Sequence, residues 1–181
     1  MKLYIIGGKA ETGKDTFGSY LKEAYEANGK KACILRFSNP LREMCRNYFN
    51  WDGSNETKPR ALLQKLGVEI IQEHLHKPSF LIDRLCEEIE ILSSFFEVFI
   101  IVDARFPKEF DELQLLYKNS IKIHMIRPDH QCKLSILEQS HITEHALDNY
   151  HNFNYVITNK DNVNLKEEAL KLFYKEEGAN K

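Results

Sequence analysis

The sequence has little of what would mark a secreted, membrane-bound or nucleic-acid-binding protein. Its cysteines, Cys33, Cys45, Cys86 and Cys132, are widely spaced and form no Cys-x-x-Cys pair, so we expect reduced thiols in a cytoplasmic protein. No stretch approaches the length of a membrane span, and the N-terminal apolar run is too short for a signal peptide. The formal net charge of −2 lacks the basic excess of a general nucleic-acid binder. We therefore expect a small-molecule partner, and neither nucleic acid nor a membrane.

Internal repeats, low-complexity tracts and domain linkers are also missing. The 181 residues are 43% hydrophobic and 29% charged, which is ordinary for a globular protein and argues against disorder. A chain of this length suits one domain with a substantial core, so residues 1–181 are predicted to form a single domain. The sequence leaves the oligomeric state open, a homodimer included.

A glycine-rich loop is present near the start of the chain. Residues 3–6 form a short apolar run that is typical of a buried strand, and from Lys14 onward apolar residues recur at helical spacing. Between them, residues 8–13 begin and end with glycine and lead directly into Lys14. Strand, loop, lysine and helix therefore occur in the order that a phosphate-binding loop requires.

The residue types of this loop suit a polyphosphate such as that of ATP. Glycine lets the backbone bend sharply and approach an anion closely, so that loop amides and the first helical turn bind the phosphates. Lys14 adds a mobile positive charge, and Asp15 stands where Ser or Thr normally contacts Mg²⁺. A turn that only caps a helix is the alternative. The predicted nucleotide-binding residues are Gly8, Lys9, Ala10, Glu11, Thr12, Gly13, Lys14, Asp15 and Thr16.

Strands and helices alternate along the rest of the chain, which indicates an α/β fold with a parallel sheet. Further strands are predicted at 31–37, 98–102, 121–126 and 153–158. Helices are predicted after Ser38, after Pro59, over 81–92, after Pro107 and after Asn164. Two stretches stand apart: a helical excursion over 38–96, in which His74 and His76 are expected on a helix surface, and a polar, lid-like segment over 128–147.

The strand ends carry the candidate chemistry. Ligands of parallel sheets bind at the carboxyl ends of the strands, where Gly8, Asp103 and Arg127 fall. Asp103 ends an apolar strand, the place where phosphate-loop enzymes keep a carboxylate for Mg²⁺, although an Asp that caps the strand-to-helix turn is the alternative. Asp15 and Asp103 are the predicted metal ligands, since magnesium prefers such hard oxygens.

Three arginines suggest a second anionic ligand. Arg105 lies two residues beyond Asp103 and points to the same side if the chain stays extended. Arg42 and Arg60 lie in the helical excursion, which would form the wall opposite the loop, and arginine grips phosphate in a two-pronged contact. Solvated surface arginines are the alternative. Candidate neighbours of a base are Phe37, Tyr48, Trp51 and Gln64, although aromatic residues are more often core.

Several segments together resemble the deoxynucleoside monophosphate kinases of the phage type. They are Gly-Lys-Asp-Thr (13–16), Arg-Phe-Ser-Asn-Pro-Leu-Arg (36–42), Pro-Arg-Ala-Leu-Leu-Gln-Lys-Leu-Gly-Val-Glu (59–69), Ile-Val-Asp-Ala-Arg-Phe-Pro-Lys-Glu (101–109), His-Ile-Thr-Glu-His-Ala-Leu-Asp (141–148) and Phe-Asn-Tyr-Val-Ile-Thr-Asn (153–159). The likeness spans nearly the whole chain, and it accounts for Asp15 after the lysine.

The resemblance implies a three-layer, adenylate-kinase-like fold with strand order 2-3-1-4-5, and phosphoryl transfer from ATP with Mg²⁺ to a deoxynucleoside monophosphate. The expected lid contains Lys133 but no arginine, so either Arg127 at its base serves instead or closure of the lid contributes less. The candidate catalytic residues are Lys14, Asp103, Arg105 and Arg127. The candidate acceptor-binding residues are Phe37, Ser38, Arg42, Arg60, Gln64 and Arg105.

Other functions remain open at this point. His141-x-x-Glu144-His145 matches an inverted zinc-protease motif, yet Thr143 is expected to cap a helix there, and no third ligand is evident. A kinase for another phosphorylated acceptor, such as dephospho-coenzyme A, would share the loop. A nucleotide-binding regulator without turnover would also keep Lys14 but would not need the acceptor arginines.

Overall fold

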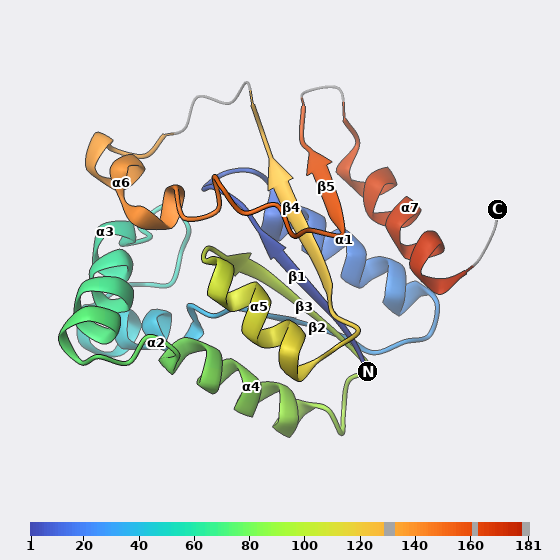
Figure 1. Cartoon of the computed structure of the whole chain (residues 1–181), viewed down its shortest axis with the longest axis horizontal. Helices are drawn as coiled ribbons and strands as arrows, with labels where there is room; N and C mark the ends of the chain where they lie inside the picture. Colours follow the sequence, from blue (N-terminus) through green and yellow to red (C-terminus); the bar gives the residue numbers. More distant parts are fainter. Residues whose placement is uncertain (129–132, 161–162, 179–181) are drawn as a thin grey trace.

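A parallel sheet forms the centre of the computed structural model, which describes residues 1–128, 133–160 and 163–178 (Figure 1). The strands are β1 (Lys2–Gly7), β2 (Ala32–Leu35), β3 (Val98–Ala104), β4 (Ile121–Ile126) and β5 (Tyr155–Thr158). They lie in the order β2-β3-β1-β4-β5, and each neighbouring pair is parallel. The α/β fold and the strand order expected from the sequence are confirmed.

Two helices cover one face of the sheet. α1 (Lys14–Ala27) and α7 (Leu165–Glu177) pack together there, and Phe17 and Phe173 are buried in their shared core. The helix predicted after Asn164 is confirmed as α7, and Asn164 caps it, because Asn164 Oδ1 accepts hydrogen bonds from two amides of the first turn. The helical spacing after the glycine loop therefore marks the face of α1 that packs on the sheet.

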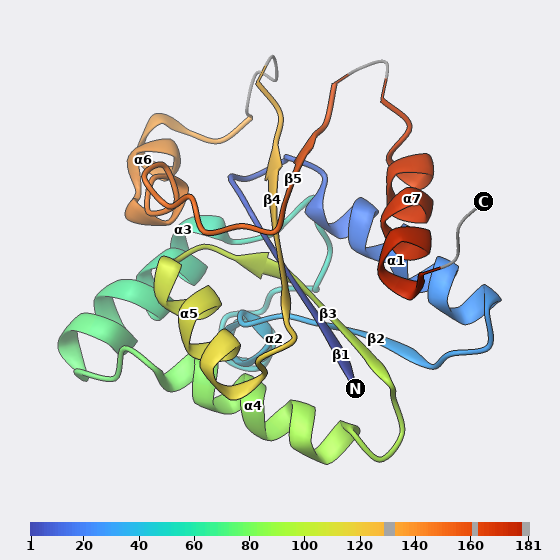
Figure 2. The same cartoon turned by 45° about the vertical axis from the view of Figure 1, so that its right-hand side comes forward.

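The opposite face is covered by α4 (Phe80–Leu92) and α5 (Pro107–Leu116), as Figure 2 shows. Leu85 of α4 and Phe110 of α5 pack against Phe99 of β3 in a second core cluster. Helices on both faces explain why β1 and β3 read as continuous apolar runs, since neither face of these strands meets water. The result is a three-layer α/β/α arrangement.

The helical excursion differs in one respect from the prediction. It contains α2 (Asn39–Tyr48) and α3 (Arg60–Gln64), but α3 continues as a π-helix, η1 (Lys65–His74). Apolar residues spaced three to four apart do not distinguish the two helix types, so the sequence could not reveal the change. His74 ends η1, whereas His76 lies beyond it with a positive φ of 53°, so the placement of His76 on a helix was wrong.

The connection from β4 to β5 carries two short helices, α6 (Ile136–Ser140) and η2 (Ile142–Glu144). In both views α6 lies beside α3, so this connection reaches across to the helical excursion (Figures 1 and 2). We call residues 133–148 the lid segment. Residues 129–132 of the lid-like segment predicted over 128–147 lie outside the described residues. Thr143 does not cap η2, because the side chain of His141 accepts the Thr143 amide instead.

Two sequence expectations concern the chain as a whole. Cys33, Cys45 and Cys86 are free thiols, and Cys132 lies outside the described residues. Among the residues that the structure describes, none of the helices combines the length and apolar character needed to cross a membrane.

Candidate active site

A cavity of about 740 Å³ opens where the strands end, between the glycine loop and the helical excursion. Its lining includes these predicted site residues: Ala10, Glu11, Gly13, Lys14, Asp15, Thr16, Phe37, Ser38, Arg42, Arg60, Gln64, Asp103, Arg105 and Arg127. The structure thus brings together the loop, the arginines and both candidate metal ligands. Gly8, Lys9 and Thr12 belong to the loop but do not line the cavity.

The two glycines of the loop are required by its geometry. Gly8 has φ +142°, and a Cβ there would lie 2.2 Å from the Met125 carbonyl oxygen. Gly13 has φ +94°, and a Cβ there would lie 2.8 Å from Asn159 Nδ2. Asn159 donates to the Thr12 carbonyl at 3.1 Å, which ties the end of β5 to the loop. The loop therefore packs so closely on the sheet that only glycine fits at both ends.

Lys14 lies buried at the start of α1, with its ammonium held by the loop itself. Its Nζ donates to the Lys9 carbonyl and lies 3.3 Å from Thr12 Oγ1. Burial and the charge of Arg105 lower the pKa of Lys14 well below its usual value, although Glu144 and the two aspartates oppose this. A bound anion would stabilise the protonated amine, so this position suits a phosphate ligand.

The side chains of Lys9 and Thr12 face away from the cavity. Lys9 Nζ forms an ion pair at 2.8 Å with Asp148, at the end of the lid segment. Thr12 Oγ1 donates to the Lys9 carbonyl at 3.0 Å and so braces the loop from within. Neither side chain therefore lines the cavity.

Asp103 connects the end of β3 to the start of α2. Its Oδ1 accepts from the Phe37 amide at 2.9 Å, and its Oδ2 accepts from the Ser38 amide at 3.1 Å and the Ser38 hydroxyl at 2.6 Å. Ser38 is the N-cap residue of α2, but its hydroxyl makes no capping bond; it also accepts from Arg42 Nε at 3.0 Å. Asp103 thus orders the side of the cavity that the start of α2 borders.

Asp15 is the more open of the two candidate metal ligands. Its side chain is 67% exposed, and its Oδ1 accepts from Arg36 Nη2 at 2.7 Å. Burial would raise the pKa of Asp15, but Arg36, Lys14 and Lys58 outweigh it and lower the pKa, so the carboxylate is ionised at neutral pH. Magnesium sites commonly use one or two carboxylates plus phosphate oxygens and waters. The pair Asp15 and Asp103 fits that requirement.

The wall opposite the loop carries several cations. Arg42, Lys58 and Arg60 all line it, and Arg60 Nη2 lies 3.9 Å from Glu11 Oε1 on the glycine loop. Burial lowers the pKa of Arg42, whereas burial followed by the charges of Arg42 and Arg60 lowers the pKa of Lys58 to about 8. Like charges held together in a cavity repel one another, and a bound anion would relieve that repulsion, so this wall suits an anionic ligand.

The predicted base neighbours divide into two pairs. Phe37 and Gln64 line the cavity, together with apolar residues of α3 and η1. Tyr48 and Trp51 are absent from the cavity lining; Tyr48 is exposed at the surface. Trp51 is buried under the guanidinium of Arg42, whose Cζ lies 5.8 Å from the ring centroid. Trp51 is thus a core residue, which was the alternative to its being a neighbour of the base.

Arg105 is positioned by two glutamates that the sequence analysis had not assigned to this role. The buried Glu109 accepts from the Arg105 and Phe106 amides at 2.6 and 3.0 Å, which fixes the turn before α5. Burial raises the pKa of Glu109 to about 7, although these two hydrogen bonds oppose the change. Glu144 of the lid segment accepts from Arg105 Nη1 at 2.7 Å.

The histidine motif in the lid segment does not assemble a metal site. His145 lies 3.1 Å from Asp148 and 2.9 Å from the Gln139 carbonyl, whereas Glu144 turns toward Arg105. Over residues 1–128, 133–160 and 163–178, no three His, Cys, Asp or Glu side chains are grouped so that they could hold a metal ion. These contacts give the zinc-protease interpretation no support.

The sequence analysis missed several cavity residues: Arg36, Lys58, Glu109, Glu144 and Asn159. Most of them lie inside the segments that carry the family resemblance, so that resemblance could have identified them as candidate site residues. No periodicity or spacing distinguishes a cavity lysine such as Lys58 from a surface one. The role of Glu144 depends on a contact across 134 residues of sequence, which only the fold reveals.

Comparisons with known proteins agree with this geometry. A family model described as deoxynucleotide monophosphate kinase matches residues 41–169. The fold is similar to the APS kinase of Mycobacterium tuberculosis in complex with AMPPNP and APS, at 11% identity and a TM-score of 0.52, with 97% of each chain covered. It is also similar to a shikimate kinase from Bacteroides thetaiotaomicron, at 10% identity and a TM-score of 0.51, with 98% of each chain covered. The search of curated proteins found no match.

Proposed function

Since the chain belongs to the deoxynucleotide monophosphate kinase family and has a P-loop kinase fold, we propose that it transfers the γ-phosphoryl group of ATP to a deoxynucleoside 5′-monophosphate. The products would be the deoxynucleoside diphosphate and ADP. The observation that carries this proposal is the cavity itself, in which the glycine loop faces a wall of cations supplied by other elements. Such a cavity suits two phosphorylated ligands that meet in the middle.

On the donor side, the glycine loop holds the β- and γ-phosphates of ATP. The amides of the loop and of the first turn of α1 point toward the anion, and Lys14 places its charge at the outer phosphates. Arg127 and Asn159, which line the cavity after β4 and β5, border this side. The APS kinase of similar fold was solved in complex with AMPPNP, an ATP analogue, which supports ATP as the donor.

On the acceptor side, the excursion over 38–96 holds the monophosphate. Arg42, Arg60 and Arg105 supply donors for its phosphate, which carries nearly two negative charges. Phe37, Gln64 and the apolar residues of α3 and η1 form the part of the lining that suits a flat base. The lid segment, residues 133–148, would cover both ligands.

Chemistry then consists mainly of alignment and charge neutralisation. An oxygen of the acceptor phosphate attacks the γ-phosphorus of ATP, and the bond from that phosphorus to the β–γ bridging oxygen breaks as ADP leaves. No general base is needed, because the acceptor oxygen is already ionised. Lys14, the loop amides and Arg105 stabilise the charge on the group in transfer.

Asp15 and Asp103 are the residues that would hold Mg²⁺. When bound, Mg²⁺ would neutralise phosphate charge and orient the β- and γ-oxygens. Asp15 offers the exposed carboxylate, and Asp103, which already accepts three hydrogen bonds, suits contact through a water. Activity is therefore expected to require Mg²⁺ or Mn²⁺ and to survive removal of zinc.

The test is a substrate panel with purified protein. ATP and Mg²⁺ are supplied with dAMP, dCMP, dGMP, dTMP, the matching ribonucleotides and dephospho-coenzyme A, and both ADP and the phosphorylated acceptor are measured. Turnover of at least one deoxynucleotide above its ribonucleotide is the expected result. Turnover of dephospho-coenzyme A alone would show that the acceptor is not a deoxynucleoside monophosphate. Tight ATP binding without any turnover would indicate a nucleotide-binding regulator.

A further inference from the structure

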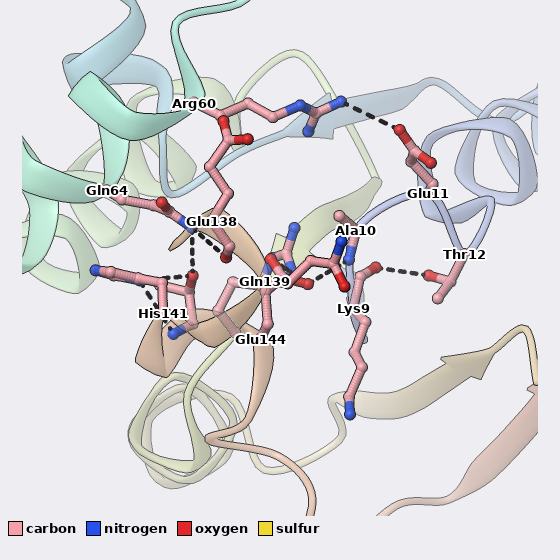
Figure 3. A network of polar contacts seen from close by, with 12 residues as sticks. Lys9, Ala10, Glu11, Thr12, Arg60, Gln64, Glu138, Gln139, His141 and Glu144 are labelled. Atoms are coloured by element: carbon pink, nitrogen blue, oxygen red, sulfur yellow. Dashed lines mark hydrogen bonds and ion pairs between the residues drawn. The ribbon is translucent and has the colours of Figure 1, made fainter. Parts of the chain in front are cut away.

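The carboxylate of Glu144 lies between the glycine loop and Arg105. Its Oε2 accepts from the Ala10 amide at 2.7 Å, and its Oε1 accepts from Arg105 Nη1 at 2.7 Å. Figure 3 shows Glu144 beside Ala10 and the loop, with the lid segment behind it. The side chain is only 8% exposed, so these contacts are made away from bulk water. A single carboxylate therefore binds one group on each side of the cavity.

Both partners of Glu144 are groups that the proposed function assigns to phosphates. The Ala10 amide belongs to the loop that would bind the phosphates of ATP, and Arg105 belongs to the acceptor site. A carboxylate resembles part of a phosphate, because it presents two anionic oxygens to hydrogen-bond donors. Glu144 and a phosphate oxygen cannot occupy the same donor at the same time. A phosphate oxygen that takes the Ala10 amide, or the Nη1 donor of Arg105, would therefore displace Glu144 from that contact.

The lid segment is tied to both sides of the cavity by further contacts. Its Lys133 amide donates to Glu11 on the loop at 3.2 Å. Gln64 of α3 donates to the Glu138 carbonyl and to Thr143 Oγ1, each at 3.3 Å (Figure 3). These contacts are longer than those of Glu144, and the contact of Lys133 is exposed. Glu144 thus makes short, charge-assisted contacts that hold the segment over the loop, and the exposed ion pair of Asp148 with Lys9 also holds it there.

We propose that Glu144 is a positioning residue that occupies the places of phosphate oxygens in the ligand-free protein and thereby couples the donor and acceptor sites. This inference rests on the proposed function. Because one side chain makes both contacts, a first ligand that displaces it from one contact also loosens its hold on the other. The first ligand then bears most of the free-energy cost of displacement, and the second binds at a lower cost. Each nucleotide should therefore strengthen the binding of the other by the same factor, since such coupling is reciprocal.

The experiment measures binding by calorimetry with AMPPNP, Mg²⁺ and the deoxynucleoside monophosphate that turns over fastest in the panel. For the wild type, AMPPNP affinity should rise by about 5-fold or more when the monophosphate is present, within the usual range of coupling between sites. Glu144→Gln removes the charge but keeps a similar shape. In that variant each ligand alone should bind several-fold more tightly, and the coupling factor should fall toward 1.

Glu138→Gln is the matched control. It removes the same charge from the same lid segment, but the Glu138 carboxylate accepts from Ser135 in the cap of α6, and a glutamine oxygen can accept the same bonds. Glu138 also feels the charge of Arg60, so the variant can change the affinity for the monophosphate, but no contact joins it to the Ala10 amide or to Arg105 among the described residues. Its coupling factor should stay at the wild-type value, whereas a nonspecific charge effect would change both variants alike. Weaker or unchanged AMPPNP binding by Glu144→Gln, or full coupling in that variant, would overturn the inference. If wild-type protein bound no AMPPNP at all, the proposed function itself would fail.

Discussion

At the level of single residues, Lys14 is the group whose removal should separate activity from folding. Its ammonium contacts only the loop that it follows, so Lys14→Ala leaves both core clusters intact. Loss of one preorganised charge stabiliser typically costs roughly 3 kcal/mol, or about 100-fold or more in turnover. We expect that loss in kcat with little change in the melting temperature. Lys22→Ala, which breaks an exposed ion pair with Glu26 on the same helix, is the control and should retain activity.

Lys58 should give acceptor binding a pH dependence that arginines cannot give. Burial and the neighbouring charges of Arg42 and Arg60 lower its pKa to about 8. The protonated amine attracts the acceptor phosphate, so affinity should be constant below that pKa and fall as the pH rises through 8. Loss of one charged contact corresponds to about 10-fold in the dissociation constant.

The measurement is acceptor binding at pH values from 6.5 to 9.5 for the wild type, Lys58→Arg and Lys65→Arg. Lys58→Arg should bind at low pH and lose the dependence, because arginine stays charged. Lys65, exposed on η1, is the control and should behave as the wild type does. A profile that Lys58→Arg leaves unchanged would assign the dependence to another group.

At the level of elements, α3 is expected to bind the acceptor monophosphate. The glycine loop after β1 is expected to bind the donor, ATP. Arg60→Ala should raise KM for the monophosphate about 10- to 100-fold, the range for a lost charged contact, and lower kcat if alignment suffers. ATP affinity measured without acceptor should change little. Arg60→Lys should recover only part of the loss, since a point charge cannot form the two-pronged contact.

Two titrations, ATP and acceptor, on the wild type and both Arg60 variants test the division of roles. Arg84→Ala on α4 removes another helical arginine, paired with Glu87 at the surface, and should affect neither ligand. Equal weakening of both ligands in Arg60→Ala would point to a general effect, such as loss of the contact with Glu11. An unchanged KM for the monophosphate would remove Arg60 from the acceptor site.

The elements themselves were largely predictable from the sequence, for a physical reason. Strands buried on both faces require unbroken apolar runs, and helices on a sheet require one apolar face, so β3 and α1 leave clear patterns. The π-helical turn of η1 leaves no such pattern. Neither does the contact between Glu144 and Ala10, because it depends on where the whole connection from β4 to β5 lies. The loop and strand-end residues were found because motif and topology bring them together, whereas Lys58 and Arg36 required the cavity to be seen.

At the level of the whole molecule, the cavity is a place where stability and ligand binding oppose each other. Cations from the loop, α2, α3 and the end of β3 are held close together, which disfavours the ligand-free fold. Carboxylates such as Glu144 and Asp103 offset part of that repulsion. Ligands that bind the native state should therefore raise the melting temperature of this protein, by an amount that depends on their concentration.

Glu109 should make the stability of the whole fold depend on pH. Burial raises its pKa from 4.5 to about 7 in the folded protein. Between those pH values the folded state keeps a proton that the unfolded state has lost, so the free energy of unfolding should fall as the pH rises through this window and level off above 7. A pKa difference of that size corresponds to roughly 3 kcal/mol.

Glu109→Gln cannot titrate, yet its amide oxygen can still accept from the Arg105 and Phe106 amides. Urea unfolding of both proteins from pH 4 to pH 8 should therefore show the wild type losing about that much stability relative to the variant. Glu112→Gln, which breaks an exposed ion pair with Lys108 on the same helix, should change by less than about 1 kcal/mol at any pH. A constant difference between wild type and Glu109→Gln across the range would mean that folding leaves the pKa of Glu109 unchanged.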